Sequence, residues 1–583
     1  MKGSGRATAN HKQGTGFFVM APGTDDARLS MMDNNNAMVM SMGPRDSFEQ
    51  GGLGPNNRFV AGDKFFNYQQ FGALRDGGGV DLFSSQYFGI LFATAHSSIV
   101  YSILRYCMRP TLMHSLNLQR SESSVVIECL LSIPTTLSFF IGLASDVFPI
   151  CGYRRKSYMI VGALLSFCTT LGMAIISATI NVDELTEDER SSYIGYYMAL
   201  IMGTTFGTML SKIGTDSRII ELSQREPLTT RGKLQINYLL FRTAVEWVGL
   251  WLTYALTRYD AENFNYRLVL DSFWMYIILA LISLLPVPFV LRNCTEPSVE
   301  QAAREALAAV AAGDDTAAAG AKTEASDRLR AFFRMCQQRA VWQIVLFLCV
   351  LLACTRFYFG SANKLFVKLA NLDANTTLRD NALKYIATMG AMIWWKVSWS
   401  NSSWRRCVCL GIGVTVFLET LRALLMLYVP STRGQTLYDI MGCMMGFTDG
   451  IITIFSFIPA TEIAENGSEG ATIGMLLSFR SIIAIAMKTM SEQWMVDVAP
   501  VESKDDTGRI CMLLLIAYAV HALGCLSVML LPRQKLDAQQ MRVYGGYSSF
   551  ACGVIWLIFL LFFVYAMTQN LKAMIEMADG ASS

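Results

Sequence analysis

The sequence predicts an all-α polytopic membrane protein with two six-helix halves and one additional C-terminal helix. Hydrophobic residues make up 52% of the 583 residues and charged residues only 16%, whereas soluble domains carry about 25% charged residues. Apolar runs of roughly 20 residues, the length that crosses a bilayer, recur along the chain. A charged stretch from Arg292 to Arg339 divides these runs into two sets of six.

The N-terminal part of the chain consists of an arm and the first six spans. Residues 1–80 are rich in Gly, Asn, Asp, Ser and Met without a sustained period, and we expect a mostly disordered, cytoplasmic arm. The N-terminal half, residues 81–291, is expected to cross the membrane at 86–106, 122–144, 157–180, 192–212, 235–257 and 271–291.

The second part begins with a linker, residues 292–339, which contains an alanine run and is expected to be cytoplasmic and partly helical. The C-terminal half, residues 340–532, has expected spans at 340–361, 380–400, 406–428, 436–460, 470–494 and 509–531. The segment 533–583 contains one more apolar run, Phe550 to Met567. We interpret this run as a thirteenth span, with a helix lying on the membrane surface as the alternative.

One polar stretch, Gly142 to Ser157, determines the predicted orientation. It reads G-L-A-S-D-V-F-P-I-C-G-Y-R-R-K-S, and three adjacent cations beside a span favour the cytoplasmic side. Asp146 can pair with a cation or with a helix N-terminus of a neighbouring segment, which would make this loop a latch. An ordinary anchored loop is the alternative.

A similar basic loop, Trp404-Arg405-Arg406, occupies the corresponding place in the second half. At the spacing of Asp146, however, this half has Val397, so an asymmetric latch is favoured over an anchor repeated twice. Asp146, Arg154 and Arg155 are therefore candidates for gating. Two matching halves joined by a long linker are typical of a secondary transporter.

Three motifs carry a resemblance to a known family. The stretch S-D-V-F-P-I-C-G-Y-R-R-K-S-Y, the segment D-S-R-I-I-E-L (Asp216 to Leu222) and the segment Phe457 to Thr472 (F-I-P-A-T-E-I-A-E-N-G-S-E-G-A-T) resemble those of the folate–biopterin transporter family. L-L-P at Leu530 to Pro532, followed by another span, is similar to its trypanosomatid-type members. The resemblance implies a major-facilitator fold, and it adds Asp216, Glu462 and Glu469 to the gating candidates.

The chain departs from the family pattern at Lys212, where a second aspartate is common. The departure puts in doubt a coupling role for an aspartate pair at this place.

Several ionisable residues lie within the expected spans, where each costs at least ~2.5 kcal/mol near the bilayer centre and should face a cavity or a partner. They are Glu128, Arg242, Glu246, Arg356, Lys396, Glu419, Arg422, Asp449, Arg480 and Lys488. Arg242 with Glu246, and Glu419 with Arg422, have the spacing of pairs that neutralise each other on one helix.

Asp449 and Arg480 have no opposite charge within one turn. Asp449 lies in the stripe Gly442-x-x-x-Gly446-x-x-x-Gly450, which lets another helix approach closely. We therefore place both residues in a substrate site, together with four further candidates: Arg242, Glu128, Lys396 and Arg356.

The resemblance implies folates or pterins as substrates, and their chemistry suits these charges. The glutamate tail of a folate is dianionic and matches the fork of an arginine, while the N–H edge of a pterin suits a carboxylate such as Asp449 or Glu128. A carboxyl group in a dry cavity has a raised pKa and can carry a coupling proton. We expect a proton-coupled transporter in the plasma membrane, with lipid, substrate and protons as its partners.

The alternatives are a transporter of another small solute and a nutrient receptor that does not transport. An enzyme is not expected, because no metal-ligand spacing, cofactor motif or nucleophile–base arrangement is visible. The 14 cysteines are scattered, the 4 histidines are dispersed, and the net charge of +2 does not favour nucleic acid.

Overall fold

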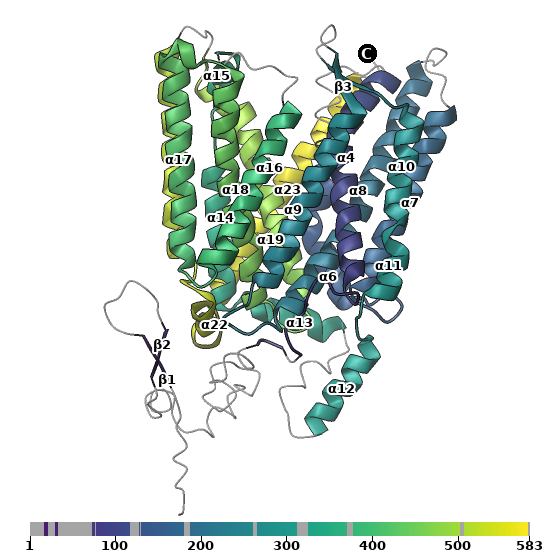
Figure 1. The fold of residues 1–583 in the computed structure, drawn as a ribbon, viewed down its shortest axis with the longest axis vertical. Coiled ribbons are helices and arrows are strands. Elements are labelled where there is room, and N and C mark those ends of the chain that lie inside the picture. Colours follow the sequence, from purple (N-terminus) through teal and green to yellow (C-terminus); the bar gives the residue numbers. More distant parts are fainter. Residues whose placement is uncertain are drawn as a thin grey trace, which may run out of the picture.

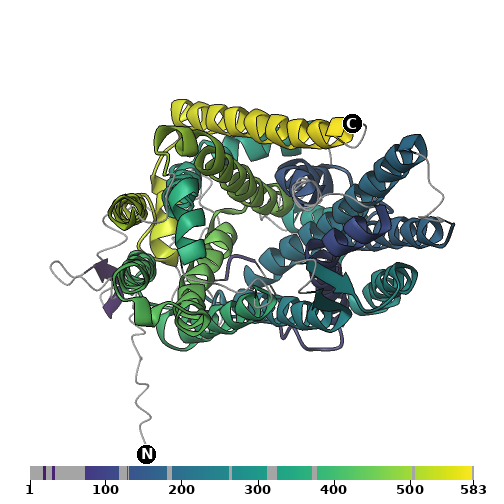
Figure 2. The same ribbon diagram turned by 90° about the horizontal axis from the view of Figure 1, so that it is seen from above.

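The computed structural model consists almost entirely of helices, arranged as two bundles side by side (Figure 1). The first bundle is formed by the N-terminal half of the chain and the second by the C-terminal half, as the view from above also shows (Figure 2). The residues described are 17–20, 29–32, 73–75, 77–116, 128, 130–179, 187–260, 265–311, 325–369, 377–501 and 506–580.

The N-terminal bundle contains the short helix Leu130–Thr136 and seven longer elements. These are α4 (Phe88–Leu116), α6 (Ser138–Val147), α7 (Lys156–Thr179), α8 (Glu187–Ser223), α9 (Lys233–Leu256), α10 (Ser272–Leu284) and α11 (Pro286–Asn293). A hairpin that was not predicted, β3 (Thr257–Asp260) with β4 (Asn265–Leu268), follows α9. The linker contains α12 (Val299–Ala311) and α13 (Ala325–Cys336), which agrees with the expected partial helix.

The C-terminal bundle contains the helices of the second half of the chain, followed by two further helices. Its elements are α14 (Arg339–Thr355), α15 (Gly360–Leu369), α16 (Thr377–Trp394), the π-helical turn η4 (Trp395–Trp399), α17 (Trp404–Tyr428), η5 (Pro430–Thr432), α18 (Gln435–Ile463), α19 (Glu469–Thr489), η6 (Met490–Trp494), α20 (Met495–Val498), α21 (Thr507–Leu523) and η7 (Gly524–Met529). The chain then forms α22 (Lys535–Tyr544) and α23 (Ser549–Gly580).

Eight of the described helices are long and apolar enough to cross a membrane, and two bent helix pairs raise the number to ten. One bent pair is Leu130–Thr136 with α6, at 45°, and the other is α14 with α15, at 51°. The first bend follows Pro134, whose ring removes a helical hydrogen bond. The spans predicted at 122–144 and 340–361 are therefore not single straight helices.

The three remaining predicted spans coincide with α8, α9 and α16, which do not meet the same measure of length and hydropathy. Polar content accompanies the difference: the span-like part of α8 is rich in Gly, Thr and Tyr, α9 carries Arg242 and Glu246, and α16 carries Arg379, Asp380 and Lys384. Helix α8 continues beyond the span expected at 192–212, as far as Ser223.

The two ends of the bundles are distinct. The linker helices α12 and α13 lie at one end together with α22, and we call it the linker end; the β3–β4 hairpin lies at the other, which we call the hairpin end (Figure 1). The last helix, α23, ends at the hairpin end of the molecule (Figure 1). Its segment Ser549–Lys572 is long and apolar enough to span a membrane, as expected for a thirteenth span.

Helix α23 packs along both bundles rather than beside one of them (Figure 2). Its Phe559 contacts Phe139 and Phe140 of the N-terminal bundle and Phe479 of the C-terminal bundle. Farther along, Asn570 accepts a hydrogen bond of 3.1 Å from Ser132. The sequence did not indicate that this helix bridges the two halves.

The expected disorder of residues 1–80 falls mostly outside the described residues. Among the described residues of this stretch, β1 (Phe17–Met20) pairs with β2 (Leu29–Met32), and Leu74 is buried. The amides of Leu74 and Arg75 donate to the carbonyl of Gln224 at 2.7 and 3.0 Å. The end of the arm is therefore part of the fold.

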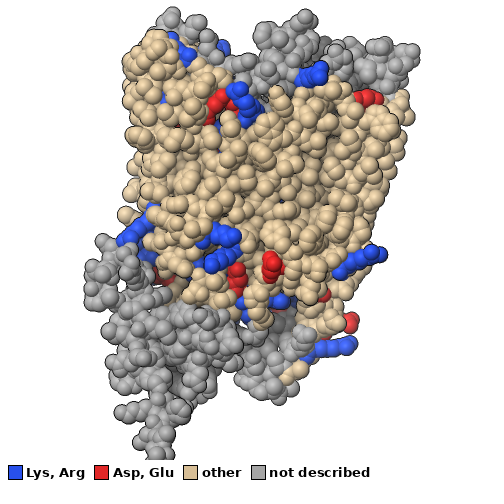
Figure 3. Space-filling model, in the orientation of Figure 1, with Lys and Arg blue, Asp and Glu red and all other residues tan. Residues whose placement is uncertain are grey.

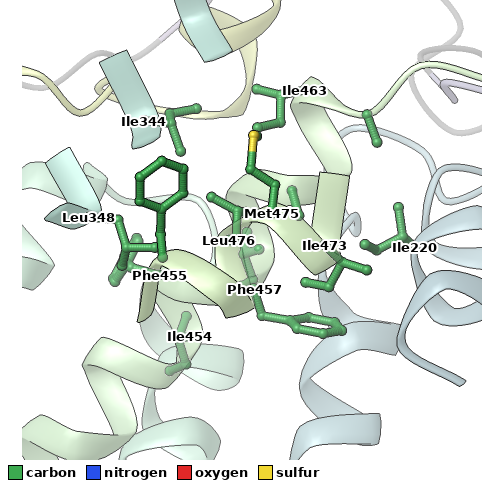
Figure 4. Close-up of a cluster of buried hydrophobic side chains, with 14 of the residues drawn as sticks. Ile220, Ile344, Leu348, Ile454, Phe455, Phe457, Ile463, Ile473, Met475 and Leu476 are labelled. Atoms are coloured by element: carbon green, nitrogen blue, oxygen red, sulfur yellow. The ribbon is translucent and has the colours of Figure 1, made fainter. Parts of the chain in front are cut away.

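The largest apolar core crosses the boundary between the halves (Figure 4). Ile220 of α8 lies there near Ile473 of α19, beside residues of α14 and α18 (Figure 4). Helices α6 and α19 also meet backbone to backbone, since a Cβ on Gly142 would lie 2.0 Å from the carbonyl oxygen of Gly470. This packing holds the halves together at the linker end.

Candidate functional site

A buried ion-pair cluster lies where the loop before α7 meets α19. Arg155 is fully buried and its guanidinium contacts three carboxylates: Asp146 at 2.5 Å, Glu221 at 2.9 Å and Glu469 at 2.8 Å. A fourth contact goes to the hydroxyl of Ser145 at 2.7 Å. Burial lowers the pKa of Arg155, but the attraction of Asp146 and Glu221 outweighs it and the pKa is raised. We call these four charged residues the Arg155 cluster.

Asp146 connects this cluster to the N-terminus of α19. Its carboxylate accepts from the amides of Gly470 at 3.1 Å and Ala471 at 2.6 Å. Free amides at a helix N-terminus and the helix dipole both favour a negative charge at this position. The contact joins residues that lie 324 and 325 positions apart, and it bridges the two halves.

A second ion pair bridges the halves at the same end. Arg231, before α9, lies 3.0 Å from Glu462 near the end of α18, and both are buried. Gln539 of α22 donates to Glu462 at 2.6 Å. Nearby, burial lowers the pKa of Lys535 to about 8 and raises that of Glu226 to about 7. Acidic and basic side chains gather at the linker end of the face shown in Figure 3.

The predicted gating residues do not all contribute in the same way. The backbone amide of Arg154 donates to Glu296 at 3.1 Å, but among the described residues no ion pair of its side chain is found. In the second half, Arg405 donates to the carbonyls of Leu531 and Met529 at 2.6 and 3.1 Å. The side chain of Val397 is 76% exposed, so this loop has no counterpart of the Asp146 contact.

Two basic residues outside the predicted spans also join the Arg155 cluster. Arg75, from the end of the arm, forms an ion pair with Glu469. Arg328 of α13 donates to the carbonyl of Asp146 at 2.8 Å. Sequence reasoning missed both, because neither an arm nor a linker shows a span pattern that would point to a site.

A second charged group lies deeper, between α8, α9 and α19. Asp216 lies 3.6 Å from Arg242, which lies 3.7 Å from Glu246, and the hydroxyl of Tyr238 donates to Asp216 at 2.5 Å. The expected pairing of Arg242 with Glu246 is therefore present, but Asp216 shares the arginine. Asp216, predicted as a gating residue, belongs to this group instead of the Arg155 cluster.

Arg480 of α19 and Lys212 of α8 complete this central group. Arg480 interacts electrostatically with Arg242 and Glu246, and Lys212 with Arg242, Asp216 and Arg480. Within the described part of the chain, no hydrogen bond or ion pair of the Arg480 side chain is found. The central group thus holds three cations and two carboxylates, an excess of positive charge. Lys212 was noticed in the sequence only as a departure from a family pattern.

The other predicted substrate-binding residues lie in cross-bundle or local pairs. Arg356, at the end of α14, lies 3.6 Å from Asp449, and both side chains are about half exposed. Glu128 pairs with Lys488 of α19. Lys396 of η4 donates to Asn237 of α9 at 2.7 Å. The Arg356–Asp449 pair interacts electrostatically with Arg480.

The expected pairing of Glu419 with Arg422 is not observed. Glu419 instead lies 2.8 Å from His521 of α21, and the guanidinium of Arg422 lies over the ring of Tyr438 at 4.7 Å. The glycine stripe of α18 receives α16, since a Cβ on Gly446 would lie 2.5 Å from the carbonyl of Lys384. No group of three or more metal-binding side chains is found among the residues that the structure describes.

A comparison with family profiles establishes the family to which the sequence motifs point. The profile of the BT1 family matches residues 99–543. The chain belongs to the BT1 family. This match covers most of both bundles, the linker and nearly all of α22, and it confirms the resemblance to the folate–biopterin transporters. No relative is found among curated proteins.

Solved structures confirm the fold of this BT1 family member. A proton:xylose symporter of the major facilitator superfamily, bound to 6-bromo-6-deoxy-D-glucose, is similar with a TM-score of 0.51 and 14% identity over 79% of this chain and 96% of that chain. A bacterial homologue of the iron transporter ferroportin in an outward-facing state has a TM-score of 0.50 and 13% identity over 76% and 98%. The protein is a multi-pass membrane transporter with the major-facilitator fold.

Proposed function

We propose that this protein transports a folate or a pteridine such as biopterin, coupled to protons, by alternating access of its two halves. The observation that carries the substrate class is Arg480, a cation at the boundary of the halves that has no ion pair among the described residues and lies beside Arg242 and Lys212. An anionic carboxylate substrate would supply the missing partner, and an arginine binds a carboxylate in a bidentate manner.

The pterin end of the substrate needs a different partner. Asp449 is half exposed and held loosely by Arg356 at 3.6 Å, so its carboxylate is free to accept from the N–H edge of a pterin ring. The two sites are linked, because both Asp449 and Arg356 act electrostatically on Arg480. In this proposal Asp449 and Arg480 bind the substrate, while Arg356 and Arg242 position them.

The remaining candidates are assigned to conformational roles. Glu128 and Lys396 each bond across the two halves, so we assign them to closing contacts rather than to direct substrate binding. The Arg155 cluster and the Arg231–Glu462 pair form the gate at the linker end, and we assign this end to the cytoplasm because of its basic loops. The moving units are residues 81–291 and 340–532.

Proton coupling is assigned to the carboxylates of the central group. Glu246 and Asp216 both lie near Arg242, and protonation of either would release this arginine toward an anionic substrate. Such an exchange couples the binding of a proton to the binding of an anion. The proposal includes a plasma-membrane location, since uptake from the medium requires one, and immunolabelling of intact cells tests it.

Uptake of labelled folate and biopterin in one expression system tests the substrate assignment, with nucleosides and amino acids as competitors. We expect competition only within the folate and pterin class, and a loss of uptake of at least about tenfold in Arg480→Ala. Arg480→Lys keeps the charge without the fork and should retain part of the activity. Wild-type rates in Arg480→Ala and Asp449→Asn at equal surface amounts would reject the site.

A further inference from the structure

A recess of about 460 Å³ opens at the linker end of the N-terminal bundle, next to the Arg155 cluster. Its walls come from the residue before α4, the start of α7, the last turns of α8 and the residues after it, the end of α11 and the segment between α11 and α12. Four cations line it: Lys156, Arg218, Arg225 and Arg292. The only acidic side chain among its lining residues is that of Glu296.

The acidic groups near the recess are already engaged. Glu296 accepts from the backbone amides of Arg154, Arg155 and Lys156, at distances of 2.7 to 3.2 Å. It therefore occupies the N-terminus of α7 and cannot neutralise the four cations as well. Glu221, behind the recess, is shared between Arg155 and Arg218.

The three arginines, in contrast, keep unused donors, whereas the ammonium of Lys156 donates to the carbonyl of Leu291 at 2.7 Å. Arg218 is only 4% exposed, and its Nε atom is buried without a hydrogen-bond partner. The Nε atom of Arg225 is also buried without one. For Arg292, which is exposed, the structure shows no hydrogen bond or ion pair with another described side chain. A buried donor without an acceptor is costly, and a ligand with several acceptor oxygens would satisfy these Nε atoms.

The surroundings of the recess indicate where this ligand comes from. Leu281, Leu284, Leu285 and Leu291 of α10 and α11 are between 38% and 62% exposed, and they form an apolar strip that leads to Arg292. Basic side chains lie at the lower end of the tan flank over α11 in Figure 3. An apolar strip that ends in a basic recess fits acyl chains joined to an anionic headgroup.

We propose that the recess binds a phosphate monoester, carried by an anionic membrane lipid whose acyl chains lie on this leucine strip. Arg225 and Arg292 would hold the phosphate, because arginine forks match phosphate oxygens, and Arg218 would donate from the floor. Glu221 pairs with both Arg218 and Arg155. A phosphate bound to Arg218 would therefore be connected to Arg155 through this one carboxylate.

Binding of short-chain lipids to the purified full-length protein in detergent tests this proposal. The probes are dioctanoyl phosphatidylinositol monophosphate, dioctanoyl phosphatidylcholine and soluble inositol bisphosphate, each titrated and followed by native mass spectrometry. We expect the phosphorylated lipid to bind, phosphatidylcholine to bind at least about tenfold more weakly, and the double variant Arg225→Gln/Arg292→Gln to lose at least about tenfold in affinity for the phosphorylated lipid.

Two controls keep the outcome decisive. Arg304→Gln removes an exposed cation of α12 that pairs only locally with Glu300, and its affinity should stay within about twofold of wild type. If the double variant does not fold, Arg292→Gln alone serves, since this side chain is exposed. If inositol bisphosphate binds as tightly as the phosphorylated lipid, the recess is a phosphate site, but its ligand is a soluble phosphate ester and the lipid assignment is overturned. Unchanged affinity in the variants, or equal binding of phosphatidylcholine, would overturn the proposal.

Discussion

At the scale of single residues, the linker end depends on Arg155 and on the carboxylates that surround it. A buried cation with three acidic partners balances a large desolvation cost against attraction and hydrogen bonds. Arg154, its neighbour in sequence, has the same charge, but only its backbone amide makes a hydrogen bond among the described residues. The two arginines therefore provide a matched comparison of two adjacent cations.

We predict that Arg155→Ala destabilises the protein by about 3–5 kcal/mol, because it leaves buried carboxylates without their cation. Arg154→Ala should change stability by about 1 kcal/mol or less. The thermal unfolding midpoints of the two purified variants, compared with wild type, measure the difference. Similar midpoints for both variants would show that the Arg155 cluster does not hold the linker end together.

The raised pKa of Glu226 leads us to predict that the stability of the protein depends on pH. Burial raises its pKa to about 7, above the value of about 4.3 for an exposed glutamate. The folded state therefore binds a proton that the unfolded state has lost, and stability falls as pH rises through 7. Lys535, with its pKa lowered to about 8 by burial, and the Arg231–Glu462 pair are its charged neighbours.

For Glu226 alone, we expect a loss of about 1.4 kcal/mol between roughly pH 6 and pH 8. Glu226→Gln should remove this part of the pH dependence, while its amide oxygen can keep one of the two bonds that Glu226 accepts from the amides of Gly232 and Leu234. Thermal unfolding of both proteins across this range is the measurement. An identical pH slope in wild type and Glu226→Gln would contradict the assignment.

At the scale of elements, two contacts decide how the halves meet: the close approach of α6 to α19, and the path of α23 along both bundles. The first depends on glycine, because a Cβ at position 142 would meet the backbone of Gly470. The second depends on aromatic side chains from both halves. Neither contact can be recognised in one helix alone.

Gly142→Ala should weaken the closed linker end by about 1–3 kcal/mol, since the new methyl group can be accommodated only if α6 and α19 separate. Gly413→Ala is the control, because nothing lies within 4 Å of a Cβ built at that helical glycine. The labelling rate of a cysteine introduced at Ser145 reports the opening. Equal labelling in the two glycine variants would argue against tight packing of these helices.

Phe559→Ala in α23 should cost roughly 3 kcal/mol, because Phe559 is 4% exposed and packs between aromatic residues of both bundles. Phe550→Ala removes a side chain of the same size that is 83% exposed and should have little effect. Unfolding midpoints in detergent distinguish the two variants. A comparable loss in both would mean that α23 contributes only through its insertion into the membrane.

At the scale of the whole molecule, the linker end is closed by contacts between the halves, and transport by alternating access requires these contacts to break. The halves also touch farther from that end, where the hydroxyls of Thr135 and Ser481 lie 2.7 Å apart. Cysteines at these positions would come close enough for a disulfide, in which the sulfurs lie about 2 Å apart.

We predict that oxidation of Thr135→Cys/Ser481→Cys stops uptake and that a reductant restores it. Thr169→Cys/Thr204→Cys is the matched control, because those hydroxyls lie 2.8 Å apart within the N-terminal bundle. Its disulfide should leave most of the activity, since no contact between the halves is locked. Uptake before and after reduction, in a background without reactive native cysteines, decides between relative movement and a rigid pair of bundles.

Which features of the fold could be predicted depends on how far apart in the sequence the interacting residues lie. The helical segments were predicted from local apolar runs, and even the polar helices α8, α9 and α16 lie where spans were expected. The sequence also indicated that Asp146 could contact a helix N-terminus, but not which helix. The bends after Pro134 and after α14, and the path of α23, depend on neighbours that a local pattern does not contain.

The sequence by itself determined the membrane-spanning architecture, because apolar length and loop charge are local properties that the bilayer selects. The tertiary structure alone decided which charges meet. Asp146 binds amides more than 300 positions away, Asp216 shares Arg242 with Glu246, and Glu419 pairs with His521 in place of Arg422. The physical reason is that a charge buried in a membrane protein needs a partner or a cavity, and which of these it meets is decided by the packing of helices instead of by distance along the chain.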